Sequence, residues 1–297
     1  MHVIDLPASL DYRTLDGVLD GAASANGKTL FDARHVRFVD PCGMVGLLAA
    51  GTRVRERSGA PPRLELPADA DVLGYMARMG LVAAAADVFD LDARPPRRVS
   101  AADSDVLLEI TPITTNSDVH DVVDRVQGRA VQILSRTLRY PPSAVVQFSV
   151  ILSEVCQNIL EHAEATGWVA AQAYRWQKRL GRHVLVIAVA DLGRGFKGSL
   201  AAVHSARFGD RWGDATALEA AFIHGLTRFP DSGSGQGIQQ IRKQVRRWDG
   251  IISIRSGRAR IADVPSWDDT PPLTDGMEDF PGAQITIILP GRTDDAA

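Results

Sequence analysis

Three polar side chains recur every four residues in SEVCQNILEHA, residues 153–163: Glu154, Asn158 and His162. A helix places these positions on one face and the apolar residues between them on another. A carboxylate can orient or deprotonate an attacking hydroxyl, and an amide oxygen can ligate Mg²⁺. Taken alone, the spacing favours an exposed polar face without chemistry, and His162 fits a structural histidine better than a ligand.

A fourth polar group, Asp191, follows the apolar segment HVLVIAVA directly, in the stretch ADLGRGF, residues 190–196. An unpaired buried carboxylate is costly, but its oxygens can accept a hydrogen bond from an amino group such as that of adenine. Gly193 and Gly195 allow the backbone to turn sharply and lie close to a ligand. On this segment alone, an ordinary glycine turn after a strand is an equally good interpretation.

A glycine-rich loop lies further along the chain, in SGSGQGIQQIRKQVRRW, residues 232–248. Gly233, Gly235 and Gly237 stand immediately before a predicted amphipathic helix. Such a loop can direct backbone N–H groups and the positive end of the helix dipole at phosphate. A single loop of this kind is weak evidence, but the order of the three segments is more specific.

The elements that must position these residues fall into two patterned halves. The first half alternates strands and helices, which predicts a small α/β sandwich. Its strands are expected at His2–Asp5, Thr29–Ala33 and Arg63–Leu66, and its helices at Tyr12–Gly21, Gly43–Arg57 and Asp69–Met79.

In the second half long helices come first and strands cluster late, which favours an α+β layer over a doubly wound parallel sheet. Strands are expected at Val106–Ile110, Trp168–Trp176, His183–Ala190, Ile251–Ser256 and Ala283–Leu289, and helices at Ser117–Leu138, Ser143–Ala163, Asp214–Gly225 and Ile238–Trp248.

The composition bounds the classes of function. The chain has 297 residues and a formal charge of -3, so it lacks the global positive field that holds a nucleic-acid backbone. Its apolar runs are too short to span a bilayer and its start does not resemble a signal peptide, so we expect a cytoplasmic protein that binds neither nucleic acid nor membrane. Cys42 and Cys156 are expected to be reduced thiols.

A linker is predicted at residues 96–103, within the proline- and arginine-containing segment ARPPRRVSAADS. It divides the chain into a domain of residues 1–95 and a domain of residues 104–297. Residues 257–282, rich in proline and aspartate, are expected to form a surface insertion.

An E-x-x-x-N helix, a strand ending in D-x-G-x-G and G-x-G-x-G opening a helix together resemble the ATP-binding fold of gyrase, histidine kinases and MutL, the GHKL superfamily. SEVCQNILEHA is most similar to the bacterial anti-sigma factor serine kinases, and the resemblance covers most of residues 104–297. It implies a two-layer α+β domain with ATP and Mg²⁺ as cofactors. It also implies that residues 196–232 form a lid over ATP. The implied roles are catalytic base for Glu154, Mg²⁺ ligand for Asn158, adenine reader for Asp191, an adenine-side turn for Gly193 and Gly195, and a phosphate cradle for Gly233, Gly235 and Gly237.

The first half resembles the STAS fold of anti-sigma factor antagonists, which are the substrates of those kinases. In that family a strand ends in Asp-Ser-Ser-Gly before a helix, and here the equivalent stretch is Asp40-Pro41-Cys42-Gly43. Cys42 therefore takes the place of the phosphorylated serine, and a thiol is not an ordinary phosphate acceptor. We expect a buried, inert cysteine and a fixed docking module rather than a redox-sensitive substitute.

The sequence thus predicts a regulatory ATP-binding protein that phosphorylates a partner on serine. Two alternatives are an ATP-gated interaction switch without phosphoryl transfer and a slow ATPase similar to MutL. The resemblance implies a protein partner, either a STAS-type antagonist or a sigma-like factor, and a homodimer is compatible with it. The basic run Arg242, Lys243, Arg246 and Arg247 is expected to be a solvated helix face.

Overall fold

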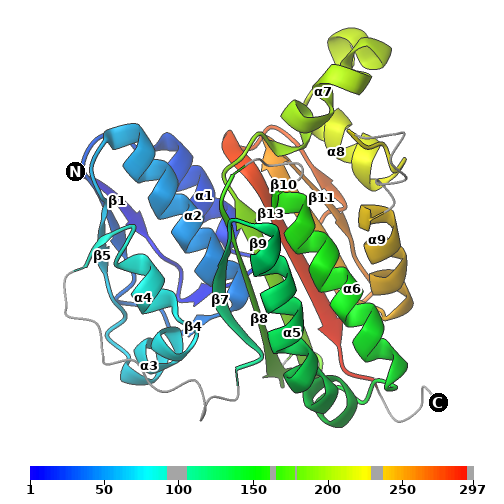
Figure 1. Ribbon diagram of the computed structural model, residues 1–297. Coiled ribbons are helices and arrows are strands. Elements are labelled where there is room, and N and C mark those ends of the chain that lie inside the picture. Colours follow the sequence, from blue (N-terminus) through cyan, green and yellow to red (C-terminus); the bar gives the residue numbers. More distant parts are fainter. Residues whose placement is uncertain (92–105, 161–164, 178, 229–236, 293–297) are drawn as a thin grey trace.

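The computed structural model describes residues 1–91, 106–160, 165–177, 179–228 and 237–292. Figure 1 shows a small sheet with its helices, formed by the first ninety residues, beside a large sheet formed by the rest. The chain is therefore of mixed α/β class. The predicted linker at residues 96–103 lies outside the described residues.

The N-terminal part contains a parallel sheet of order β1-β3-β5-β6. Its predicted strands and helices are present, with ends shifted by up to three residues, and short elements are added to them. The large elements are β1 (His2–Asp5), α1 (Leu15–Ser24), β3 (Thr29–Asp32), α2 (Pro41–Ser58), β5 (Arg63–Glu65) and α3 (Ala70–Arg78). The short ones are β2 (Ser9–Leu10), β4 (Phe38–Val39), α4 (Leu81–Ala85) and β6 (Asp90–Leu91).

Helix α2 is the centre of this part, and its start is strongly specified by sequence. The Asp40 carboxylate caps it by accepting from the Gly43 amide at 2.8 Å, and Pro41 occupies the first turn, where no intrahelical donor is needed. A Cβ at Gly43 would overlap the Leu10 carbonyl, so only glycine allows this close approach. All residues in the first three turns of α2 are buried, which is typical of a helix that is covered on all sides.

The C-terminal part is a seven-stranded antiparallel sheet of order β12-β11-β10-β13-β9-β8-β7, with α5, α6 and α9 on one face (Figure 1). Its strands are β7 (Leu108–Ile113), β8 (Gly167–Trp176), β9 (Arg182–Asp191), β10 (Ile251–Gly257), β11 (Ala259–Asp263), β12 (Leu273–Thr274) and β13 (Phe280–Pro290). Its helices are α5 (Asn116–Gln132), α6 (Ser143–Asn158), α7 (Gly195–Phe208), α8 (Asp214–Phe222) and α9 (Gly237–Arg247), with short turns at Ile133–Thr137 and Gly209–Arg211.

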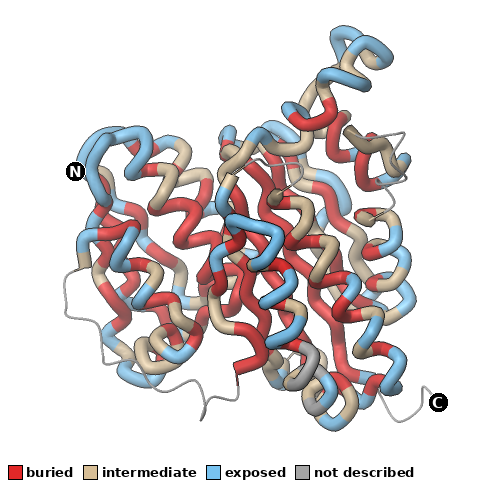
Figure 2. The backbone as a smooth tube through the Cα atoms, viewed as in Figure 1, coloured by how far each residue is buried: buried red, intermediate tan, exposed pale blue. Residues whose placement is uncertain are grey.

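Strand β9 explains how the two parts meet. Every residue from Val184 to Asp191 is buried, because both faces of the strand are covered. Leu185, Ile187 and Val189 pack with the helices, whereas the alternate residues belong to the same core as α1 and α2. The continuous red band in Figure 2 passes through the sheet and into the N-terminal part. The N-terminal part therefore shares its core with the underside of the large sheet.

Residues 257–282 correct one expectation. Instead of forming only a surface insertion, they extend the sheet by strand β11 and the edge strand β12. Asp268, in the loop between these two strands, accepts from the Tyr12 hydroxyl at 2.6 Å and pairs with Arg179. The Arg179 guanidinium lies over the rings of Trp176 and Trp267. The segment thus fastens the two parts together.

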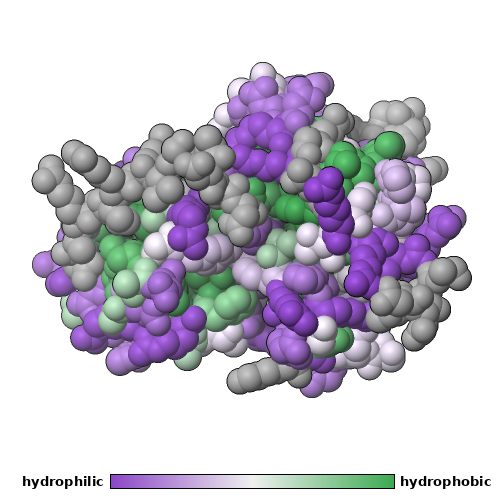
Figure 3. Space-filling model, turned by 90° about the horizontal axis from the view of Figure 1, so that it is seen from below, coloured by the Kyte–Doolittle hydropathy of each residue, from purple (hydrophilic) through white to green (hydrophobic). Residues whose placement is uncertain are grey.

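Two observations concern the surface. Among the described residues, none of the helices has both the length and the apolar character needed to cross a membrane. Seen from below, apolar side chains reach the surface in patches among hydrophilic ones (Figure 3).

Candidate functional site

Helix α6 carries Glu154 and Asn158 one turn apart near its C-terminal end, and both are half-buried. The Asn158 amide nitrogen donates to the Glu154 backbone carbonyl at 2.8 Å. This bond uses the donor side of the amide and leaves its oxygen as the group able to ligate a cation. His162, the third residue of the predicted face, lies outside the described residues.

Glu154 meets the beginning of α9. A Cβ at Gly237, the first residue of that helix, would overlap the Glu154 carboxylate. The carboxylate and the helix N-terminus, 83 positions apart in the sequence, are therefore in contact only because residue 237 is glycine. Gly233 and Gly235, predicted in the same loop, lie outside the described residues.

Asp191 is the last residue of β9 and is 5% exposed. Side chains alternate along a strand, so Asp191 faces the same side as Val189, which is the face covered by α5, α6 and α9. The amides of Gly193, at 2.8 Å, and Ala283 donate to the carboxylate. Burial raises the pKa of Asp191 to about 6, because loss of hydration outweighs these two hydrogen bonds.

Gly167 connects Asp191 with α6. The two residues are register partners on β8 and β9, and a Cβ at Gly167 would lie 2.9 Å from the side chain of Ile159, directly after α6. Asp191, the Glu154–Asn158 end of α6 and the start of α9 therefore gather at one end of the sheet.

Ser256 and Gly282 hold the turn after Asp191, and sequence reasoning missed both. Gly195 opens α7 with φ 63°. The Ser256 hydroxyl accepts from the Phe196 amide at 3.0 Å and donates to the Gly282 carbonyl at 2.8 Å. A Cβ at Gly282, where φ is 76°, would overlap the Asp191 carbonyl. Gly282 is recognisable as a glycine before an apolar strand, whereas Ser256 has no sequence signal.

Cys42 lies on the opposite face of the large sheet. Its thiol is hydrogen bonded to the Thr286 hydroxyl of β13 at 2.9 Å and is 4% exposed. Thr286 pairs with Ala188, whose side chain belongs to the core shared with α2 rather than to the Asp191 side. Cys42 is therefore buried, as expected, and burial raises the pKa of its thiol well above its usual value, which disfavours the reactive thiolate.

Asp40, beside Cys42, is also buried. One carboxylate oxygen caps α2, and the other has no hydrogen-bond partner among the residues that the structure describes. Burial raises the pKa of Asp40 to about 7, and the nearby charge of Asp11 adds to this effect.

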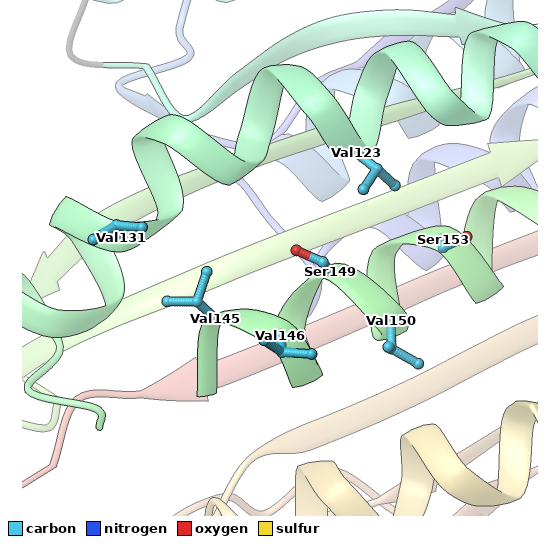
Figure 4. Close-up of a pocket in the computed structure, with 7 residues that line it drawn as sticks. All are labelled: Val123, Val131, Val145, Val146, Ser149, Val150 and Ser153. Atoms are coloured by element: carbon cyan, nitrogen blue, oxygen red, sulfur yellow. The ribbon is translucent and has the colours of Figure 1, made fainter. Parts of the chain in front are cut away.

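A cavity of about 670 Å³ lies away from these residues, between α5 and α6 (Figure 4). Val131, Val146 and Val150 on its rim are exposed. None of the predicted site residues lines it. The complete lining is Val123, Val131, Val145, Val146, Ser149, Val150 and Ser153.

The basic run of α9 is not entirely solvated, which corrects a second expectation. Arg242 pairs with Asp263 at 2.7 Å and lies over the Phe222 ring. It thereby joins α9 to α8 and to strand β11. In the described part of the chain, no group of three or more histidine, cysteine or acidic side chains is arranged to hold a metal ion.

Comparison with models of protein families gives no match for this chain, and comparison with curated proteins gives none either.

Proposed function

We propose that the chain is a regulatory ATP-binding protein of the GHKL type, similar to anti-sigma factor serine kinases, with a fused STAS-like N-terminal domain. The observation that carries the proposal is the convergence of three sequence motifs. Glu154 contacts Gly237, and Asp191 lies opposite Gly167, against which the end of α6 packs. The motifs are recognisable from the sequence alone, and a random distribution over the fold would not bring them to one end of one sheet.

The residues present fit an adenine nucleotide with Mg²⁺. Asp191 is buried, held by two amides and able to accept from an amino group. The Asn158 amide oxygen is oriented by the bond from its own nitrogen to α6. The N-terminus of α9 has the positive dipole end that favours phosphate, with glycine where a side chain would collide with Glu154.

The chain's own residues then have separable tasks. Asp191 selects the base by accepting a hydrogen bond from its amino group, and Asn158 would hold the cation. Mg²⁺, when bound, neutralises charge on the transferred phosphate. Glu154 accepts the proton of the attacking hydroxyl on a partner serine.

The acceptor belongs to a separate protein under this proposal. Cys42 occupies the position of the phosphorylated serine, but it lies on the face of the sheet opposite Asp191 and packs on Thr286. Phosphoryl transfer within the chain would require the N-terminal part to leave its shared core. The same observation favours a second candidate function, an ATP-gated interaction switch that transfers no phosphate.

Calorimetric titration with ATP and Mg²⁺ tests the nucleotide site. Saturable binding to the wild type and its loss in Asp191→Asn are expected, because the amide presents a donor where the carboxylate accepts. Absence of saturable binding to the wild type would contradict the proposal.

Glu154→Gln separates the candidate activities. With ATP labelled on the γ-phosphate and an extract of the source cells, the kinase labels a protein on serine, and the variant does not while it still binds ATP. Phosphate release without a labelled protein identifies an ATPase. A nucleotide-dependent signalling output that survives in Glu154→Gln identifies the switch.

A further inference from the structure

The two parts of the chain meet through a buried arginine at the end of β10. Arg255 is 2% exposed, and its guanidinium donates to the carboxylates of Asp16 at 3.0 Å and Asp20 at 2.5 Å, both on α1. Arg260 makes a second ion pair with Asp16. A buried guanidinium needs such partners, because leaving it unpaired is strongly destabilising.

The next residue, Ser256, faces the other side of the sheet. Strand alternation places its side chain with Ile252 and Ile254 on the helix-covered face. There its hydroxyl joins the first turn of α7 to Gly282 through the bonds to the Phe196 amide and the Gly282 carbonyl. The amide of Ala283, the residue after Gly282, donates to the Asp191 carboxylate.

Two adjacent residues of one strand thus make two different connections. Arg255 is held by the N-terminal part, and Ser256 holds the turn that carries Asp191. A shift of the β10 end moves both, because a strand in a packed sheet does not bend freely between neighbouring residues.

We propose that Ser256 is a positioning residue for Asp191, and that docking of α1 on Arg255 keeps Ser256 in place. The fused N-terminal part is then a built-in modulator of the nucleotide site. The identity of the ligand rests on the proposed function, whereas the connection itself is a property of the fold.

A second ion-pair contact between the same two parts provides a matched control. Arg13 pairs with Asp269 at 2.5 Å and with Asp268 at 3.3 Å. This contact adjoins the turn between β8 and β9, where Trp176 pairs with Arg182, at the end of the sheet opposite Asp191. Arg13→Gln therefore removes an interdomain ion pair that is remote from Ser256.

Hydrogen exchange of the full chain without nucleotide tests the connection directly. In Asp16→Asn/Asp20→Asn, the asparagine oxygens still accept from Arg255 but the charges are lost, and exchange of amides at residues 191–196 is expected to rise about 5-fold. Ser256→Ala should accelerate the same amides, and Arg13→Gln should leave them unchanged. Unchanged exchange in the double variant, or an equal rise in Arg13→Gln, would overturn the proposal.

ATP affinity provides the functional readout. Asp16→Asn/Asp20→Asn is expected to raise the Kd for ATP about 3- to 10-fold, with Arg13→Gln near the wild type. If the wild type binds no ATP, the proposed function fails while the exchange experiment still decides the connection. If ATP binds equally well to the wild type and to Asp16→Asn/Asp20→Asn, modulation by the N-terminal part is refuted.

Discussion

Asp40 and Asp191 are buried carboxyl groups with raised pKa values, one on each face of the large sheet. For both, the dominant cause is burial, and backbone amides offset it only in part. Each group is more easily protonated in the folded chain than in the unfolded chain. Its stabilising contribution is therefore complete below the unfolded pKa and is lost as pH rises through the folded value.

Asp40→Asn should change the pH dependence of stability. Asparagine keeps an oxygen that can cap α2 and cannot ionise. As pH rises from 5 to 8, the wild type should lose about 2–3 kcal/mol of unfolding free energy that the variant keeps. Urea unfolding at the two pH values measures this difference, and an identical offset at both would contradict a pKa near 7.

For Asp191 the raised pKa also predicts a pH dependence of ligand binding. Only the ionised carboxylate accepts from an amino group on both oxygens, so ATP affinity of the wild type should fall as pH drops through about 6. Because Asp191→Asn is expected to lose saturable binding, the wild type is titrated at several pH values with ATP and with adenosine, which carries no phosphate. A fall in affinity through about pH 6 that both ligands share then comes from the carboxyl group. An adenosine affinity that does not change with pH would contradict this role of Asp191.

At the scale of elements, the site depends on where helices begin and strands end. Helix α6 supplies Glu154, helix α9 begins at Gly237, and β9 ends at Asp191. Each residue occupies an end of its element or lies close to one, where backbone groups have no regular partners and are available to a ligand.

Gly237→Ala tests this arrangement. The new methyl group would overlap the Glu154 carboxylate, so the side chain must move, and phosphoryl transfer or hydrolysis should fall by about 10-fold or more. Gly74→Ala in α3 is the matched control, since its methyl group meets only the end of the Arg78 side chain and should stabilise the helix by up to about 1 kcal/mol. Unchanged turnover in Gly237→Ala would show that Glu154 has no role in the reaction.

The elements themselves were largely predictable. Apolar runs predict β9 and β13. Helix α7 has no sequence signal, because residues 196–208 mix glycine, serine and small residues without a clear apolar stripe. Strands β11 and β12 have none either, because they are short and lie in a segment rich in proline and aspartate.

The sequence predicts which residues belong to the candidate site, but not the contacts between them. Spacing selected Glu154, Asn158 and Asp191, but no local pattern shows that Glu154 meets Gly237 or that Ser256 supports Asp191's turn. Those contacts depend on strand order and register, which join residues far apart in the sequence. The hydrogen bond between Tyr12 and Asp268 is equally unpredictable from local sequence, since its partners are 256 positions apart.

At the scale of the whole molecule, the sheet separates two chemistries. The face covered by α5, α6 and α9 holds the candidate nucleotide residues. The opposite face is covered by α1 and α2, with Cys42 against Thr286. Cys42, which takes the place of a phosphorylated serine in the proposed STAS-like domain, is thus part of a core contact.

Cys42→Ser tests this separation. The change introduces a hydroxyl of similar size to the thiol beside Thr286, but the folded chain should not phosphorylate it, because the sheet lies between position 42 and Asp191. Mass spectrometry after incubation with ATP and Mg²⁺ measures the modification, with Glu154→Gln in the same background as the control. Stoichiometric phosphate at position 42 that requires Glu154 would refute a permanently docked N-terminal part.

The shared core also affects how a separate protein that resembles the N-terminal part could compete for the face of the large sheet covered by α1 and α2. A tethered module is present at an effective concentration on the order of millimolar, whatever its abundance in the cell. A separate copy of this domain that binds the same face of the sheet, around Ala188 and Thr286, would have to displace the tethered domain. Its own concentration would have to exceed the effective concentration of the tethered domain. The fusion therefore keeps that surface occupied. A partner of the proposed function would have to bind elsewhere, for example at helix α7, most of which is pale blue and tan in Figure 2.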